Sequence, residues 1–98
     1  MNVAQTIIAQ LGANKFVVMT GAKNFVASKD AVHFDLPSNF AKKRINKVNI
    51  ELRSDDTYTI KFYKLRALNL TMIETVENVY ADTLQSIFTQ VTGLDVRL

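Results

Sequence analysis

The sequence has 98 residues, 48% of them hydrophobic, and this length corresponds to a single domain (residues 1–98) with a modest core. It contains no cysteine and one histidine, which excludes a disulfide framework and the usual zinc ligand sets. The formal net charge is +3. Residues 1–50 hold seven cations and two anions (+5), whereas residues 51–98 hold five cations and seven anions (−2). Such an asymmetry favours an anionic partner.

The composition also bears on location. No basic segment precedes the first apolar residues, so no signal peptide is predicted. No apolar run approaches the roughly 18 residues that a membrane span needs. We therefore expect a soluble, cytoplasmic protein without a membrane partner, and the absence of cysteine suits a reducing compartment.

The first predicted element is a short helix over residues 3–11. Asn2 is a candidate N-cap, and Gly12 follows the last apolar residue, where a helix commonly ends. One apolar stripe at helical spacing runs along it: Val3, Ala4, Ile7, Ile8 and Leu11.

Three short strands are predicted next, over residues 15–20, 25–27 and 31–36. Residues 15–20 (KFVVMT) are apolar on both sides and rich in β-branched side chains, which favours a central strand. Polar turns are predicted at residues 21–24 and 28–30. In the third strand, His33 and Asp35 alternate with apolar residues, so one face is buried and the other is wet.

Pro37 ends this strand because it cannot donate a hydrogen bond to a neighbouring strand. Residues 37–46 are predicted to be irregular or to form a single helical turn, for which Ser38 is a candidate cap.

The strongest strand pattern is a hairpin over residues 47–63. Val48, Ile50 and Leu52 share one face of its first strand, and Tyr58, Ile60 and Phe62 share one face of its second. A three-residue loop over 54–56 pairs 52 with 58, 50 with 60 and 48 with 62, so all the apolar pairs fall on one face.

A further strand is predicted over residues 68–73, followed by a helix over 79–92. In this helix Tyr80, Leu84, Ile87, Phe88 and Val91 form an apolar stripe. Asn78 is its candidate N-cap, Asp82 lies in its first turn, and Gly93 with Leu94 suits a Schellman ending.

These elements predict an α+β domain: an antiparallel sheet of five to six strands flanked by an N-terminal and a C-terminal amphipathic helix. The two helices are expected to cover one face of the sheet. The open face is expected to carry His33, Asp35, Asn49, Glu51, Thr59 and Lys61.

The residues do not assemble a recognisable catalytic site. His33 is expected to be an ordinary exposed histidine, and no serine lies in a G-x-S-x-G motif. Asp35 with Glu51-Leu52-Arg53 loosely resembles a nuclease pattern, but arginine replaces the lysine and cannot release a proton near neutral pH. No phosphate-binding glycine motif is present, so we expect neither catalysis nor a cofactor.

The aromatic residues are mostly assigned to the core. Tyr58, Phe62 and Tyr80 fall on apolar faces, whereas Tyr63 lies on the face opposite Phe62.

The best functional candidate is the basic segment Lys42-Lys43-Arg44, with Lys47 three residues on and Phe40 just before it. Cations next to an aromatic ring suit a nucleic-acid backbone and a base. Lys23, in the predicted 21–24 turn, is a weaker phosphate candidate. A solvated loop that keeps the domain in solution explains the same cations.

Three stretches of the sequence carry a resemblance. They are residues 11–16 with 19–25; Asp56-Thr57-Tyr58; and residues 79–82 with 88–89 and 91–94. In these the chain resembles a group of small, mostly uncharacterised proteins encoded by bacteriophages and related elements. The resemblance implies action in the host cytoplasm and supplies no catalytic residues.

Two functions of different classes stay open. One is non-specific binding of DNA or RNA through the basic segment. The other is a protein–protein module that modulates a host or defence factor or forms a homo-oligomer, through a sheet edge or the polar sheet face.

Overall fold

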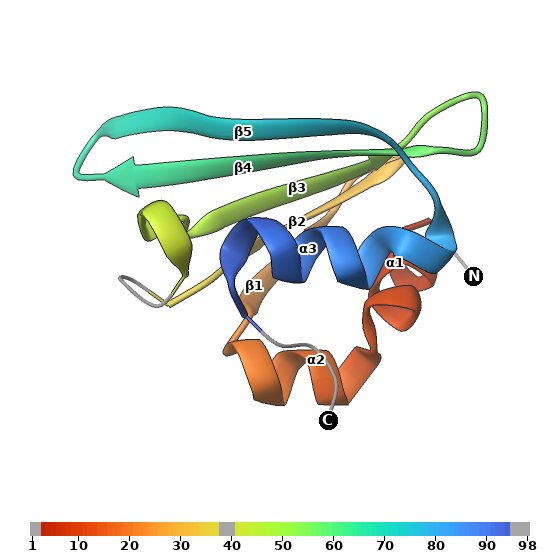
Figure 1. Ribbon diagram of the computed structural model, residues 1–98, viewed down its shortest axis with the longest axis horizontal. Helices are drawn as coiled ribbons and strands as arrows, with labels where there is room; N and C mark the ends of the chain where they lie inside the picture. Colours follow the sequence, from red (N-terminus) through yellow and green to blue (C-terminus); the bar gives the residue numbers. More distant parts are fainter. Residues whose placement is uncertain (1–2, 38–40, 95–98) are drawn as a thin grey trace.

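The computed structural model describes residues 3–37 and 41–94, and these form an α+β domain with one antiparallel sheet and helices on one of its faces (Figure 1). The helical elements are α1 (Val3–Leu11), α2 (Ala13–Thr20), η1 (Lys42–Arg44), η2 (Ala81–Thr83) and α3 (Leu84–Thr92). The strands are β1 (Lys23–Ala27), β2 (Ala31–Asp35), β3 (Lys47–Leu52), β4 (Tyr58–Arg66) and β5 (Asn69–Val79). The predicted fold class is confirmed.

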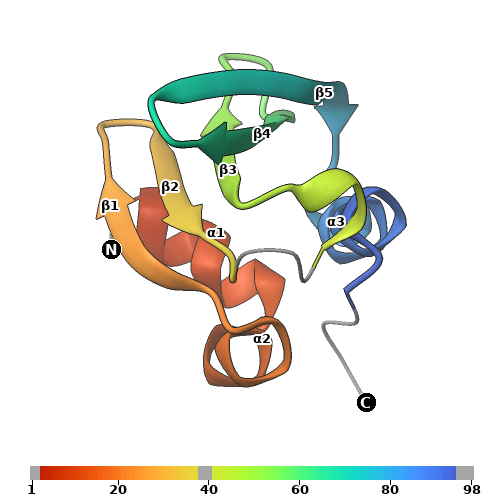
Figure 2. The same cartoon turned by 90° about the vertical axis from the view of Figure 1, so that its left-hand side faces the viewer.

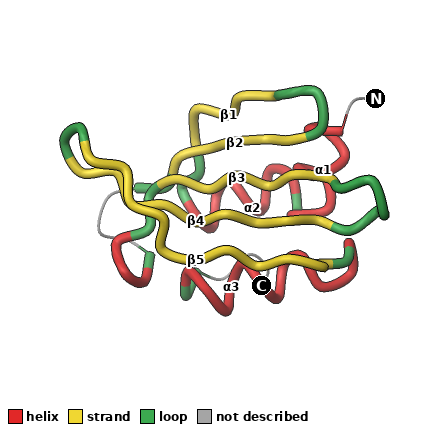
Figure 3. Tube along the Cα trace, turned by 90° about the horizontal axis from the view of Figure 1, so that it is seen from above, coloured by secondary structure: helices red, strands yellow, loops and turns green. Residues whose placement is uncertain are grey.

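The sheet is a meander in which each strand pairs with the next in the chain, in the order β1-β2-β3-β4-β5 (Figure 3). The predicted register of the central hairpin is confirmed: Leu52 pairs with Tyr58, Ile50 with Ile60 and Val48 with Phe62. All of these side chains are buried except that of Leu52, which is half-buried against the core. Turn length and apolar alternation therefore placed this hairpin correctly.

The segment 15–20 is helical, so its predicted assignment as a strand is wrong. It forms most of α2, in which Phe16 and Thr20 lie one turn apart and are buried, while Val18 is 82% exposed. Gly21 ends the helix with φ 74°, in the left-handed region that favours glycine. The burial of Phe16 and Thr20 on one side of a helix therefore outweighs the strand propensity of the β-branched residues in this segment.

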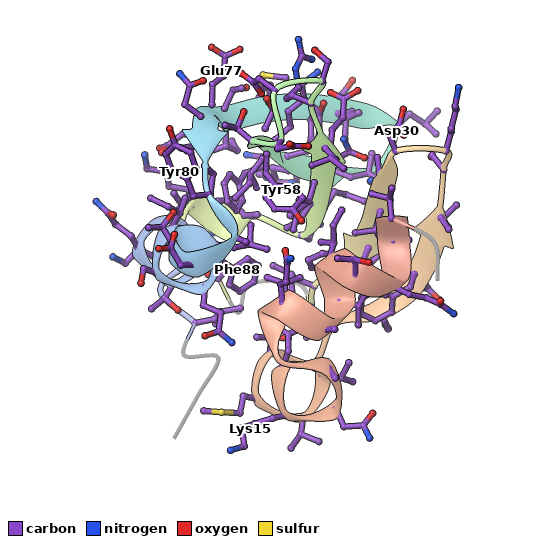
Figure 4. The ribbon with its side chains drawn as sticks, turned by 90° about the vertical axis from the view of Figure 1, so that its right-hand side faces the viewer. Lys15, Asp30, Tyr58, Glu77, Tyr80 and Phe88 are labelled. Carbon is purple, nitrogen blue, oxygen red and sulfur yellow. The ribbon has the colours of Figure 1, made fainter. Side chains whose placement is uncertain are left out.

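The C-terminal helix begins later than predicted. Asn78 is not its N-cap but the second-last residue of β5, with φ 58°, and η2 leads from the strand into α3. Tyr80 precedes η2 and is 60% exposed, so its assignment to the core is also wrong (Figure 4). The predicted ending is confirmed: Gly93 has φ 76°, and Leu94 is buried.

The core joins the helices to the sheet through aromatic side chains. Phe16 of α2 makes edge contacts with Phe34 of β2 and Phe88 of α3, at ring-centroid distances of 5.5 and 5.1 Å. Around this cluster, Tyr58 Oη donates a hydrogen bond to Gln10 Oε1 of α1 at 2.6 Å. These contacts hold all three helices on one face of the sheet.

The opposite face of the sheet is open, since no helix of the described residues covers it (Figures 1 and 3). Strand alternation places the predicted polar residues there, opposite the buried Val32, Phe34, Val48 and Ile50. Thr59 is an exception in exposure, because it is buried although it lies on this face.

Both edge strands carry irregularities of pairing. The register shifts between Lys23 and Val26 of β1, and β5 shifts twice along its pairing with β4. Such bulges twist an edge strand and make it a poorer template for a further strand.

Candidate functional site

Charged side chains gather by sign at the two ends of the sheet. We define the basic end as the cross-strand row of Asp35, Lys47, Tyr63 and Met72 together with the described residues on the side of this row where η1 and the β4–β5 turn lie. Its charged residues among the described ones are seven cations and one anion: Lys23, Lys42, Lys43, Arg44, Lys47, Lys64, Arg66 and Asp35. The basic end therefore carries a net charge of +6, and Figure 2 looks onto it.

The acidic end is the row of Ala31, Glu51 and Thr59 with everything beyond it. The described charged residues there are six anions and two cations: Asp30, Glu51, Asp55, Asp56, Glu77, Asp82, Lys29 and Arg53. This end has a net charge of −4; Asp30 and Glu77 are labelled in Figure 4, which faces it. The two ends lie apart along a molecule whose longest extent is 33 Å.

The predicted basic segment forms η1, a single turn held between two buried residues. Ala41 and Ile45 anchor it in the core, and Lys42, Lys43 and Arg44 between them are exposed. Lys43 and Arg44 have φ of 56° and 57°, in the left-handed region that costs a non-glycine residue about 1–2 kcal/mol. The turn thus exposes three successive cations, and its unfavourable backbone conformation has to be stabilised by the burial of the residues on either side of it.

Lys42 is placed by the end of α3. A Cβ added to Gly93 would lie 2.9 Å from Lys42 Cε, so the lysine stem lies across the glycine at the C-terminus of the helix. The negative end of the helix dipole favours a cation at this position.

Asn46 joins η1 to the β4–β5 hairpin. Its side chain donates from Nδ2 to the carbonyl oxygen of Leu65 at 2.9 Å and accepts from the Leu65 N–H through Oδ1 at 2.8 Å. Its backbone N–H also donates to the carbonyl oxygen of Tyr63 at 3.0 Å. The amide side chain therefore takes the place of a strand residue where β3 has ended.

This connection brings two further cations toward η1. Lys64 and Arg66 alternate with Leu65 along β4, so they share the helix-side face with Ile60 and Phe62. η1 lies on the same side of the sheet, beneath the hairpin in Figure 1. Neither residue was predicted from the sequence as a site residue; the available pattern is their alternation with Leu65, which indicates a shared face only once β4 is known to reach Arg66.

Lys47 is the one cation of the basic end, among the described residues, that is in an ion pair; of the others, Lys23 lies on β1 and five lie in η1 and the hairpin. Within the described residues, Lys42, Lys43, Arg44, Lys64 and Arg66 have no carboxylate within ion-pair distance. These five residues are called the cation cluster below.

Lys47 differs from the cluster because its charge is matched. Its Nζ donates to Asp35 Oδ1 at 2.6 Å, and Asn24 Nδ2 donates to the other carboxylate oxygen at 2.9 Å. Partial burial acts to raise the pKa of Asp35, but the hydrogen bonds from Lys47 and Asn24 outweigh it and hold that pKa below its usual value. His33 Nε2 lies 3.9 Å from the same carboxylate on the open face and is about one-third exposed.

The remaining predicted site residues have different outcomes. Lys23 is exposed on β1, opposite Asp35 and so within the basic end, but on the far edge of the sheet from the hairpin. Phe40 lies outside the described residues, as do the two candidate caps Asn2 and Ser38.

The nuclease pattern does not converge. Asp35 pairs with Lys47, and Glu51 pairs with Ala31, so the two carboxylates stand four residues apart along the strands, about 13 Å. Across residues 3–37 and 41–94, no three acidic or histidine side chains are grouped as a metal site would require.

Comparison with known proteins adds no relative. No family model, curated protein or solved structure matches the chain significantly. In the part of the chain that the structure describes, no helix has the length and apolarity needed to cross a membrane.

Proposed function

We propose that this domain binds nucleic acid without catalysing a reaction, by contacting phosphate groups through its cation cluster. The observation that carries the proposal is that η1 and the β4–β5 hairpin direct five unpaired cations to one side of one end of the sheet. Phosphate contacts of this kind supply most of the affinity of non-specific binding.

The opposite charge of the two ends supports a defined orientation. An anionic polymer is attracted to the basic end, with a net charge of +6, and repelled by the acidic end, with −4. From the resemblance to bacteriophage-encoded proteins, we also propose that the domain acts in the cytoplasm of the host cell, without a cofactor.

A salt titration tests the proposal. Each neutralised phosphate contributes a slope of about −0.9 in log K against log salt on duplex DNA, and about −0.7 on single strands. Five cations give a slope of at most roughly −4 to −5 on a duplex, with micromolar or weaker affinity at physiological salt. Fluorescence anisotropy with labelled oligonucleotides, at salt concentrations from about 10 to about 200 mM, measures this slope.

Changing Lys42, Lys43 and Arg44 together to Ala is expected to flatten the slope by about two to three. Thermal stability is expected to change by under roughly 0.5 kcal/mol, because the three side chains are exposed. As the control, Glu77→Ala with Asp82→Ala removes charge at the acidic end and is expected not to weaken binding. Absence of binding at 10 mM salt, where screening is least, would end the nucleic-acid proposal.

The second candidate is a protein–protein module. It is favoured by β5, an eleven-residue edge strand on which Leu70 and Met72 are 58% and 50% exposed. The two bulges of β5 work against continuous strand pairing along it. Sedimentation equilibrium over a hundredfold range of concentration distinguishes a self-associating chain from a monomer.

A further inference from the structure

The β4–β5 hairpin extends past the rest of the sheet. β3 begins at Lys47, opposite Tyr63, so residues 64–66 of β4 have β5 as their only strand neighbour (Figure 3). The two hydrogen bonds between the Asn46 side chain and the backbone of Leu65 are called the Asn46 clasp below, and the part of the β4–β5 hairpin beyond Tyr63 is called the ribbon. The ribbon closes in a two-residue turn, Ala67-Leu68, between the paired Arg66 and Asn69. At about 3.3 Å per residue, the ribbon projects by roughly 10 Å from the row of Tyr63.

The dimensions of this ribbon fit a groove of duplex DNA. Two paired strands lie about 4.8 Å apart and, with their side chains, fill a width close to that of the major groove, about 12 Å. The projection of roughly 10 Å is comparable with the depth of that groove, about 8.5 Å, whereas the minor groove of B-DNA is only about 6 Å wide.

The side chains near the tip suit base edges. Leu68 is 97% exposed, and Arg66 and Asn69 flank it as an exposed cross-strand pair. Arginine donates bidentately to guanine O6 and N7, asparagine pairs with adenine N6 and N7, and an apolar side chain contacts the thymine methyl group. The Asn46 clasp holds the ribbon in place before any partner arrives.

We propose that the β4–β5 hairpin enters the major groove of duplex DNA, with Arg66, Leu68 and Asn69 reaching base edges and the η1 cations contacting the phosphates beside the groove. This inference rests on the proposed function and assigns it a substrate class. Duplex RNA is disfavoured because its major groove is too deep and narrow for side chains to read.

A lipid surface fits the hairpin less well. The apolar residues Leu65, Leu70 and Met72 lie on the open face of the ribbon, opposite the face of Lys64 and Arg66. A membrane that received the apolar face would turn both cations away from its headgroups. The major groove of DNA has two walls and a floor, so in it both faces of the ribbon and its tip would contact the DNA at once.

The test compares a tip variant with a matched control on three probes. The tip variant is Arg66→Ala with Leu68→Ala. The control, Lys15→Ala with Val18→Ala, likewise removes one exposed cation and one exposed apolar side chain, but from α2. The probes are a 20-base-pair DNA duplex, an RNA duplex of the same sequence and the single DNA strand. Unchanged circular dichroism and thermal midpoints show that both variants are folded.

The tip variant is expected to bind the DNA duplex about tenfold more weakly or worse, since one good base contact discriminates by roughly five- to a hundredfold. Its binding to RNA and to the single strand is expected to fall by no more than about threefold, for the loss of one phosphate contact. The control is expected to match the wild type on all probes. Methyl green, a major-groove ligand, is expected to compete, and netropsin, a minor-groove ligand, is not.

Three results would overturn the inference, and they differ in what they leave of the proposed function. Equal weakening of the tip variant on all three probes, or competition by netropsin alone, refutes the groove assignment and leaves phosphate binding intact. Failure of the wild type to bind any nucleic acid at 10 mM salt refutes the proposed function and the inference together. In that case, binding to phosphatidylserine vesicles would assign the hairpin to a lipid surface.

Discussion

Lys43 and Arg44 show how the basic turn is held. Two successive residues in the left-handed region place the three η1 side chains outward within a single turn, between the buried Ala41 and Ile45. This conformation costs about 1–2 kcal/mol for each residue with a Cβ, and costs of this kind cluster at functional sites. Glycine at either position would relieve the cost, so the presence of cations there favours a role in binding.

Lys43→Gly is therefore expected to raise the free energy of unfolding by about 0.5–1 kcal/mol and to reduce the salt slope of DNA binding by about 0.9. Lys42→Gly is the matched control, because Lys42 is outside the left-handed region and the same change there is expected to destabilise. Urea unfolding and the anisotropy titration measure the two effects. If both substitutions destabilised the domain equally, the account of the turn would be wrong.

The carboxylate of Asp35 contributes to stability because it accepts hydrogen bonds from Lys47 and Asn24. Because its pKa in the folded protein is lowered below that of the unfolded chain, the charged form stabilises the fold. This contribution is fully present above the unfolded pKa of about 3.9 and is lost as the pH falls through the folded value.

Asp35→Asn is thus expected to lower the free energy of unfolding at pH 7, where Lys47 loses its partner. The difference between wild type and variant is expected to shrink below about pH 4, as the wild-type carboxylate becomes protonated. Urea unfolding of both proteins at pH 7, 5, 3 and 2 measures it. A difference that stayed constant over this range would show that the carboxylate charge contributes nothing to stability.

At the scale of elements, α2 and α3 end in the same way. Thr20 and Thr92 are buried, each donates its hydroxyl to the carbonyl oxygen four residues earlier, and each accepts the N–H two residues later. A glycine with positive φ follows each of them, Gly21 and Gly93. The Thr-Gly pair is therefore a helix ending that this chain uses twice.

Thr92→Val keeps the shape of the side chain and removes both hydrogen bonds. The N–H of Leu94 then lacks its partner in a buried position, which is expected to cost about 1–3 kcal/mol in the free energy of unfolding. Thr89→Val makes the same change at a half-buried position on α3 and is expected to cost under about 0.5 kcal/mol. Equal effects in urea unfolding would show that the hydroxyl of Thr92 has no capping role.

The first Thr-Gly pair, Thr20-Gly21, marks the segment whose secondary structure was predicted wrongly from the sequence. The 47–63 hairpin was predictable because alternation and turn length independently required the same register. Residues 15–20 offered no such agreement, since an apolar run of this length fits a strand or a buried helix equally well. The Thr20-Gly21 ending, identical to that of the predicted C-terminal helix, was the signal that distinguished the two.

The candidate site was predictable only in part, for a similar reason. A run of three cations, Lys42 to Arg44, is visible in any sequence. The contribution of Lys64 and Arg66 depends on how far β4 extends and on the Asn46 clasp, which is a contact between side chain and backbone. The Ala67-Leu68 turn has no glycine or proline to mark it, although Ala67 has φ 55°, so the end of β4 could not be located.

At the scale of the whole molecule, the charge separation follows from the meander. Successive connections of an antiparallel sheet alternate between its ends, so residues 41–46, which lead into β3, and the 67–68 turn both lie at the basic end. The 28–30 and 53–57 turns and the end of β5 meet at the acidic end. Because cations are concentrated in the connections at one end and anions in those at the other, the molecule has an electrostatic field directed along its strands.

This field is expected to act on the rate of DNA binding. Asp30→Asn with Glu77→Gln removes two exposed anions from the acidic end. They lie roughly 25 Å from Arg66 at about 3.3 Å per residue along the strands, and at that distance one charge alters the attraction of a phosphate by about 0.2 kcal/mol in water. Summed over several phosphates, the association rate is expected to rise about twofold at 10 mM salt, where the screening length is about 30 Å. At 150 mM salt that length is about 8 Å, and the rates of variant and wild type are expected to coincide. Stopped-flow anisotropy measures both conditions. A gain that persisted at 150 mM, or a change confined to the dissociation rate, would show that these residues contact the DNA and that the acidic end is not remote from it.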